Sequence, residues 1–277
     1  MIADFEDFCL WTYVVVDELW CQLPPAYKRG SGPAPACSDC ELLTLALVGE
    51  CRGWTTEATL PHQWAVYRHL FPQLPERRRL NRRRRGLWHA LNAIRRAVIA
   101  VLDVAQGRQC AIDSLPVPVL AFHLVPSAAG AGGWRAAGAD YGKVPTRKQT
   151  IFGDKLHLLV TLGGVIRDFA LAPASASGVA VGAGLPREQA NLVALAAEPR
   201  AERAVALLTV PRRNQRRQLT AQFGLARHRA HTFHSLCARL HTKLAAHPLH
   251  LSQPPARGQR MAPDQGARFP QLAHHPK

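Results

Sequence analysis

The hydrophobic periodicity of the chain changes near Gln109, and this change limits the folds that the chain can adopt. Before Gln109, apolar residues recur at the three- and four-residue spacing of helices. After it, short runs rich in branched residues are bounded by glycine and proline. The pattern predicts a helical domain over 1–105 and an α/β or α+β domain over 106–249. The last stretch, 250–277, has little apolar periodicity and is predicted to be disordered.

Two local signals predict helices in the first domain. Ser38 and Glu41 have the spacing of a capping box, which predicts a helix from Asp39 to about Arg52. After Gly53, the segment 56–70 is amphipathic, and 87–102 is a strong helix pattern. Two short helices around a glycine turn are compatible with a DNA-reading helix-turn-helix and equally with an ordinary helical hairpin.

The segment 76–85 places seven arginines within nine positions, and they cannot share one face of a helix. The chain has 35 Lys and Arg against 19 Asp and Glu, a formal charge of +16, so a polyanion is the expected partner. We expect this segment to bind a nucleic-acid backbone; the alternative is a solvated charge run without specificity. The candidate nucleic-acid contacts are Arg77, Arg78, Arg79, Arg82, Arg83, Arg84 and Arg85.

Strand signals dominate the second domain. Cys110–Ile112 is predicted to form a short buried strand that carries Asp113 at its end, and the prolines at 116 and 118 are expected to prevent regular pairing beyond it. The runs 156–161 and 165–171 flank two glycines and predict a hairpin. The remaining predictions are a loop over 127–139, a helix over 186–197 and a strand over 204–210.

Asp113 interrupts an apolar run in a basic chain, and this placement suggests a metal-ion site for phosphate chemistry. The alternative is a strand-end acid that faces water. A second candidate metal set is Cys37 with Cys40, completed by Cys51 and His62, although small buried helix residues explain these cysteines better.

Several segments between about Asp7 and His250 resemble bacterial insertion-sequence transposases of the DDE class. They are 32–45, Asp113-Ser-Leu-Pro-Val-Pro-Val, Phe152-Gly-Asp-Lys-Leu-His-Leu-Leu-Val-Thr, Phe169-Ala-Leu-Ala-Pro-Ala and the predicted helix 231–247. The resemblance implies an RNase H-like mixed-sheet catalytic domain. It also implies three carboxylates that hold two magnesium or manganese ions for cutting and joining DNA strands.

Within this resemblance Asp113 corresponds to the first carboxylate, as catalytic residue and metal ligand. Ala197 stands where the second is expected, with Glu198 and Glu202 nearby but outside the motif. The helix that carries the third has no counterpart, and no Asp or Glu occurs between Glu202 and Asp264. The domain is therefore expected to be shortened, with catalysis weakened or lost.

The implied partner is double-stranded DNA, at transposon ends and at the target, with Lys155 as a further contact and a homo-oligomer as a possible form. Two alternatives stay open: a non-catalytic remnant that occupies transposon ends, and a basic RNA-binding protein. No run approaches the about 20 apolar residues that span a bilayer, and the first residues are acidic. We therefore expect no membrane association and a cytoplasmic, nucleoid-associated protein.

Overall fold

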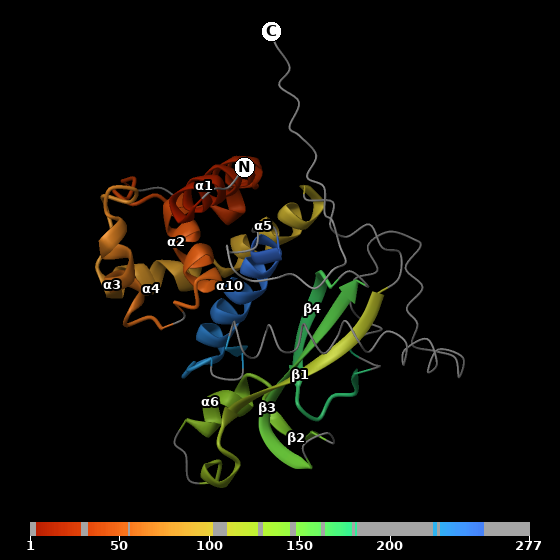
Figure 1. Cartoon of the computed structure of the whole chain (residues 1–277). Coiled ribbons are helices and arrows are strands. Elements are labelled where there is room, and N and C mark those ends of the chain that lie inside the picture. Colours follow the sequence, from red (N-terminus) through yellow and green to blue (C-terminus); the bar gives the residue numbers. More distant parts are fainter. Residues whose placement is uncertain are drawn as a thin grey trace.

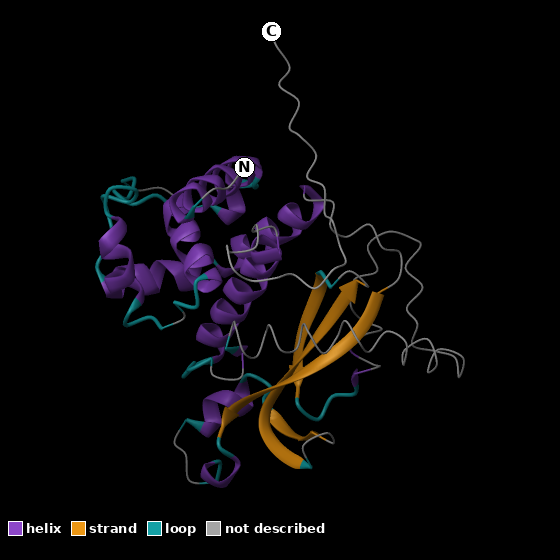
Figure 2. Cartoon of the chain, viewed as in Figure 1, coloured by secondary structure: helices purple, strands orange, loops and turns teal. Residues whose placement is uncertain are grey.

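The computed structural model describes a helical layer that packs beside a four-stranded antiparallel sheet (Figures 1 and 2). This arrangement confirms the mixed helix-and-strand class. The described residues are 4–28, 33–54, 56–101, 110–126, 130–144, 148–161, 164–178, 181, 224–225 and 228–251. Among them, no helix is long and apolar enough to cross a membrane.

The first two long helices begin at side-chain caps. Helix α1 (Phe5–Gln22) starts where the Asp4 carboxylate accepts the N–H of Asp7. Helix α2 (Asp39–Cys51) starts at the predicted capping box: the N–H of Glu41 donates to the Ser38 hydroxyl at 3.0 Å, and the Glu41 carboxylate accepts the N–H of Ser38. Every residue of α2 from Leu42 to Cys51 is buried, so this helix forms the centre of the helical layer.

The second amphipathic segment is only partly helical. Helix α3 (Leu60–Trp64) has five residues, little more than one α-helical turn, and a 3-10 turn, η2 (Ala65–Tyr67), follows it. Leu60 and Trp64 are buried as the pattern predicts, whereas Val66 is 75% exposed because the tighter winding turns it away from the core.

Three more helices complete the layer. Helix α4 (Arg77–Gly86) leads directly into α5 (Trp88–Val101), which confirms the predicted 87–102 helix. Helix α10 (Phe233–Leu251) comes from the other end of the chain and packs mainly on α5 and α2 (Figure 1). The sequence pattern places nearly all of α10 in the second domain, 106–249, but in the structure this helix lies within the helical layer.

The sheet is built around one long strand. Strand β3 (Gln149–Thr161) pairs along one side with β1 (Cys110–Leu120), and along the other side first with β2 (Asp140–Val144) and then with β4 (Ile166–Pro173). The β3–β4 pair is the predicted hairpin. At its turn, the N–H of Gly164 donates to the carbonyl of Thr161 at 3.0 Å.

Strand β1 extends past both prolines to Leu120, so the prediction of a strand ending at Ile112 is wrong. The prolines are two residues apart, and their missing N–H groups therefore fall on the same side of the strand. Among the described strands β1 pairs only with β3, so this side is an edge where no donor is needed. Pairing shifts by one residue between Pro118 and Leu120, next to Gly153, whose φ of 152° no other residue adopts easily.

The predicted loop over 127–139 also requires correction, because it contains helix α6 (Ala131–Ala136). The helix forms because Trp134, which is 3% exposed, anchors this glycine-rich segment in the core. The predicted helix over 186–197, the predicted strand over 204–210 and nearly all of the predicted disordered tail lie outside the described residues.

One hydrophobic core joins the helices to the sheet, and a buried arginine adds a polar connection. The Arg95 guanidinium, on α5, donates to the carbonyls of Ile166 and Arg167 at the start of β4, and it pairs with Asp168 at 3.3 Å. It also lies 5.0 Å from the ring centroid of Phe169. These contacts satisfy the guanidinium and fix the sheet against α5.

Candidate nucleic-acid interface and the Asp113 strand

The arginines of α4 fall into two groups in the structure. Arg77, Arg78, Arg79 and Arg82 are exposed, and within the described part of the chain no carboxylate pairs with them. Arg78, Arg79 and Arg82 lie on the side of α4 opposite the buried Leu80 and Asn81, and Arg77 is exposed at the first residue of the helix. The result is a concentrated positive surface without local neutralisation, which we call the α4 arginine face.

The other three arginines contact the protein itself. Arg83 donates to the carbonyl of Cys37 at 2.8 Å and pairs with Asp39 at 2.6 Å, so it ties α4 to the start of α2. Arg84 is 4% exposed and pairs with Glu57 at 3.1 Å. Arg85 donates to the carbonyl of Asn81 within its own helix. No local sequence signal predicts this division, because the carboxylate partners of Arg83 and Arg84 are distant along the chain.

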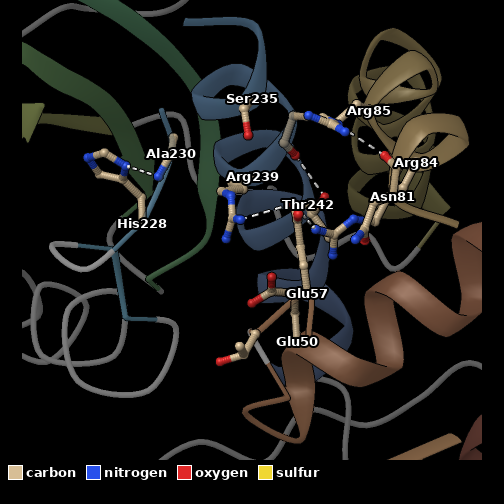
Figure 3. A network of polar contacts seen from close by, with 12 residues as sticks. Glu50, Glu57, Asn81, Arg84, Arg85, His228, Ala230, Ser235, Arg239 and Thr242 are labelled. Carbon is tan, nitrogen blue, oxygen red and sulfur yellow. Dashed lines mark hydrogen bonds and ion pairs between the residues drawn. The ribbon is translucent and has the colours of Figure 1, made fainter. Parts of the chain in front are cut away.

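Arg84 belongs to a buried charge network that connects α2, α4 and α10 (Figure 3). Glu57 accepts from both Arg84 and Arg239, the latter at 2.9 Å. Beside them, Lys243 pairs with Glu50 at 2.9 Å, and each side chain is only 3% exposed. Burial lowers the pKa of the Lys243 ammonium group, and the neighbouring Glu50 carboxylate offsets part of this lowering. Charges at this depth require partners, so the network specifies how these helices pack.

Asp113 is the fourth residue of β1 and does not lie at a strand end. It is 8% exposed and shares the core-facing side of β1 with the buried Leu115 and Val117. Its carboxylate accepts the N–H of Ser114 at 2.8 Å, and its register partner on β3 is Leu158. The reading of Asp113 as a strand-end acid facing water is therefore wrong.

A two-metal centre requires several carboxylates around Asp113, and the described residues do not supply them. No group of three His, Cys, Asp or Glu side chains that could hold a metal ion occurs in the ranges that the structure describes. Asp113 is flanked on its own strand face by apolar side chains, which give magnesium no oxygen ligands. Glu198 and Glu202 lie outside the described residues. The described residues therefore do not fit the two-metal site that the resemblance implies.

The other three acids of the sheet differ in their exposure to solvent. Asp140 is exposed, but Asp154 and Asp168 are 3% and 9% exposed. Asp168 is neutralised by Arg95 and Arg96. Among the described residues Asp154 has no hydrogen-bond partner at Oδ2, and burial raises the pKa of this carboxyl to about 6. Its register partners, Val117 on β1 and Pro173 on β4, are distant along the chain, so a local sequence pattern does not predict this burial.

Strand β3 also carries Lys155 and His157 on its other face. Lys155 is half-buried, opposite Pro116 and Ala172. His157 is fully buried, neither ring nitrogen has a hydrogen-bond partner among the described residues, and burial lowers the pKa of its imidazole, with Lys155 adding to the effect. Its side chain does not reach solvent in this structure.

The cysteines considered as metal ligands are buried around α2. Cys37, Cys40 and Cys51 are free thiols, and burial is the main cause that raises the pKa of Cys37 to about 11. The Cys37 thiol donates to the carbonyl of Ser38, and that of Cys51 to the carbonyl of Ala246 on α10. They pack as small apolar side chains between helices.

Comparisons with known proteins add no assignment: no family model, no curated protein and no solved structure matches the chain.

Proposed function

We propose that this protein binds duplex DNA through the α4 arginine face and descends from a DDE insertion-sequence transposase, with strand cutting weakened or lost. The observation that carries the proposal is the exposure of four arginines on one helix, none of which pairs with a carboxylate of the described residues. Phosphates relieve the mutual repulsion of such charges and release counterions when they bind. The rest of the chain is also basic, which favours a polyanion over an acidic peptide.

The transposase part of the proposal rests on the resemblance of the sequence around Asp113, Phe152–Thr161 and Phe169–Ala174. These segments form β1, β3 and β4, three neighbouring strands of one sheet, so the motifs that carry the resemblance meet in space. An RNase H-like domain, a location at the nucleoid and a homo-oligomer on DNA belong to the same proposal.

The proposal that strand cutting is weakened or lost rests on the small number of carboxylates that match the family's catalytic set. Asp113 is the one carboxylate that matches the family's catalytic set, and the chain has no Asp or Glu between Glu202 and Asp264. A pair of divalent cations needs more negative charge than one carboxylate supplies. The chain would then occupy DNA ends without processing them.

Equilibrium binding tests the DNA part. We expect the full chain to bind duplex DNA, and the combined change of Arg77, Arg78, Arg79 and Arg82 to Gln to weaken binding equally for all sequences. Arg68→Gln, an exposed arginine outside α4, is the control and should change affinity little. Stronger binding to structured RNA than to duplex DNA at the same salt would favour the RNA-binding alternative.

Strand cleavage tests the catalytic part. With magnesium or manganese and an element-end duplex, we expect no cutting by the wild-type chain. Cutting that disappears in Asp113→Asn would contradict the loss of catalysis, while leaving the transposase descent intact.

A further inference from the structure

A cavity of about 310 Å³ lies where the end of β1 meets the start of β3. Its lining residues are Pro118, Val119, Leu120, Ala121, Phe122, Gln149, Thr150 and Ile151. The cavity sits at the register shift of β1 between Pro118 and Leu120, an irregularity that separates the strand end from its partner. Its volume is at the lower end of the range of small-ligand pockets. Neither the Asp113 strand face nor the α4 arginine face includes it.

An exposed aromatic pair stands at this cavity. Phe122, in the 3-10 turn η3 (Phe122–Leu124), lines it and is 53% exposed. The ring of Tyr141 on β2 is 38% exposed and meets Phe122 edge-on, with 5.6 Å between centroids. Tyr141 in turn contacts the buried ring of Phe152 at 5.1 Å. The buried ring of Phe152 therefore supports Tyr141, and Tyr141 supports Phe122, while both outer rings remain partly exposed to solvent.

Three exposed cations surround the same place. Lys143 is the register partner of Thr150, and Lys148 immediately precedes Gln149, so both adjoin lining residues. The Arg135 guanidinium lies 5.7 Å from the ring centroid of Phe152. One acid, Asp140, is also exposed there and pairs in register with Gly153. Cations therefore outnumber acids around the aromatic pair, three to one among the described side chains of this rim.

We propose that this cavity receives one unpaired base of a DNA strand. Phe122 provides the surface on which the base stacks, and Gln149 and Thr150 provide polar groups that can hydrogen-bond to the base. Lys143 and Lys148 contact the adjoining phosphates. Exposed rings beside cations are the combination that binds single strands, because every base has a π-face and every nucleotide a negative charge. An acidic peptide would use the cations but not the rings, and an apolar ligand would leave the cations without a role. The inference rests on the proposed DNA binding and adds that a single-stranded end is part of the ligand.

The test compares two DNA ligands with the full chain: a blunt duplex, and the same duplex with a short single-stranded overhang. Phe122→Ala should weaken overhang binding about fivefold or more, the cost of losing one base stack. It should leave blunt-duplex binding unchanged, because that binding is assigned to α4. Phe122→Tyr keeps a ring and should retain overhang affinity. Since Phe122 is 53% exposed, its removal leaves the core intact.

A second readout reports stacking directly. A 2-aminopurine base in the overhang should lose fluorescence when it binds the wild-type chain and keep it with Phe122→Ala. Equal affinity of wild type and Phe122→Ala for the overhang duplex, or unchanged 2-aminopurine fluorescence, would overturn the inference. If the blunt duplex does not bind at all, the proposed α4 function fails, while the overhang strand alone still tests the cavity.

Discussion

Asp154 offers the sharpest test of how this part of the sheet is buried. It is 3% exposed, its Oδ2 atom has no hydrogen-bond partner among the described residues, and burial raises its pKa from 3.8 to about 6. The Asp154 carboxylate also adds to burial in raising the pKa of the Cys237 thiol, on α10, to about 11. Asp154 is therefore an acid that the fold prefers to keep protonated.

The magnitude follows from the two pKa values. A rise from 3.8 to about 6 corresponds to about 3 kcal/mol of folding free energy. Because the pKa of Asp154 is higher in the folded state, its protonated carboxyl contributes fully to the free energy of unfolding below pH 3.8. This contribution is lost as the pH rises through about 6. At neutral pH the ionised carboxylate therefore destabilises the fold.

Asp154→Asn removes this titration while keeping the shape of the side chain. Urea unfolding of both proteins, followed by tryptophan fluorescence over a series of pH values, gives the difference in unfolding free energy. We expect the wild type to lose about 3 kcal/mol relative to Asp154→Asn between pH 3.8 and neutrality. The other acids cancel in this difference. A difference that stays constant with pH would show that Asp154 is solvated, and would refute the burial described for this carboxyl.

Three further predictions concern the charged groups. Lys243→Met leaves Glu50 buried without its partner and should cost about 3–5 kcal/mol in urea unfolding, whereas Glu50→Gln combined with Lys243→Met should cost much less. Arg84→Gln should lower the melting temperature because it breaks the Glu57 network. Arg79→Gln should leave the melting temperature nearly unchanged, with an unfolding free energy within about 0.5 kcal/mol of the wild type. Equal effects of the last two changes would contradict the division of α4. His157→Leu should raise the melting temperature, because it removes two buried nitrogens without partners.

The elements that sequence predicted correctly are those set by neighbouring residues. The capping box of Ser38 and Glu41 fixes the start of α2 through contacts three residues apart. Gly164, whose N–H donates to the carbonyl of Thr161 and whose φ is 95°, fixes the β3–β4 hairpin in the same way. Local chemistry is sufficient in both cases.

The elements that sequence missed depend on distant partners. Strand β1 continues through Pro116 and Pro118 because β3 pairs on its other side, which no local pattern reveals. Arg84 is buried because Glu57 and Arg239 come from other parts of the chain. The sequence singles out Asp113 as an acid within an apolar run, but its position on the core-facing side of β1 follows only from the pairing of β1 with β3.

The salt dependence of DNA binding tests the central claim most directly. Each arginine that contacts a phosphate contributes about 0.9 to the slope of log affinity against log salt concentration. Changing Arg77, Arg78, Arg79 and Arg82 to Gln should therefore reduce the slope by about 3 to 4, while Arg68→Gln leaves it unchanged. A slope that is the same in the wild type and in the fourfold variant would show that the α4 arginine face does not contact DNA.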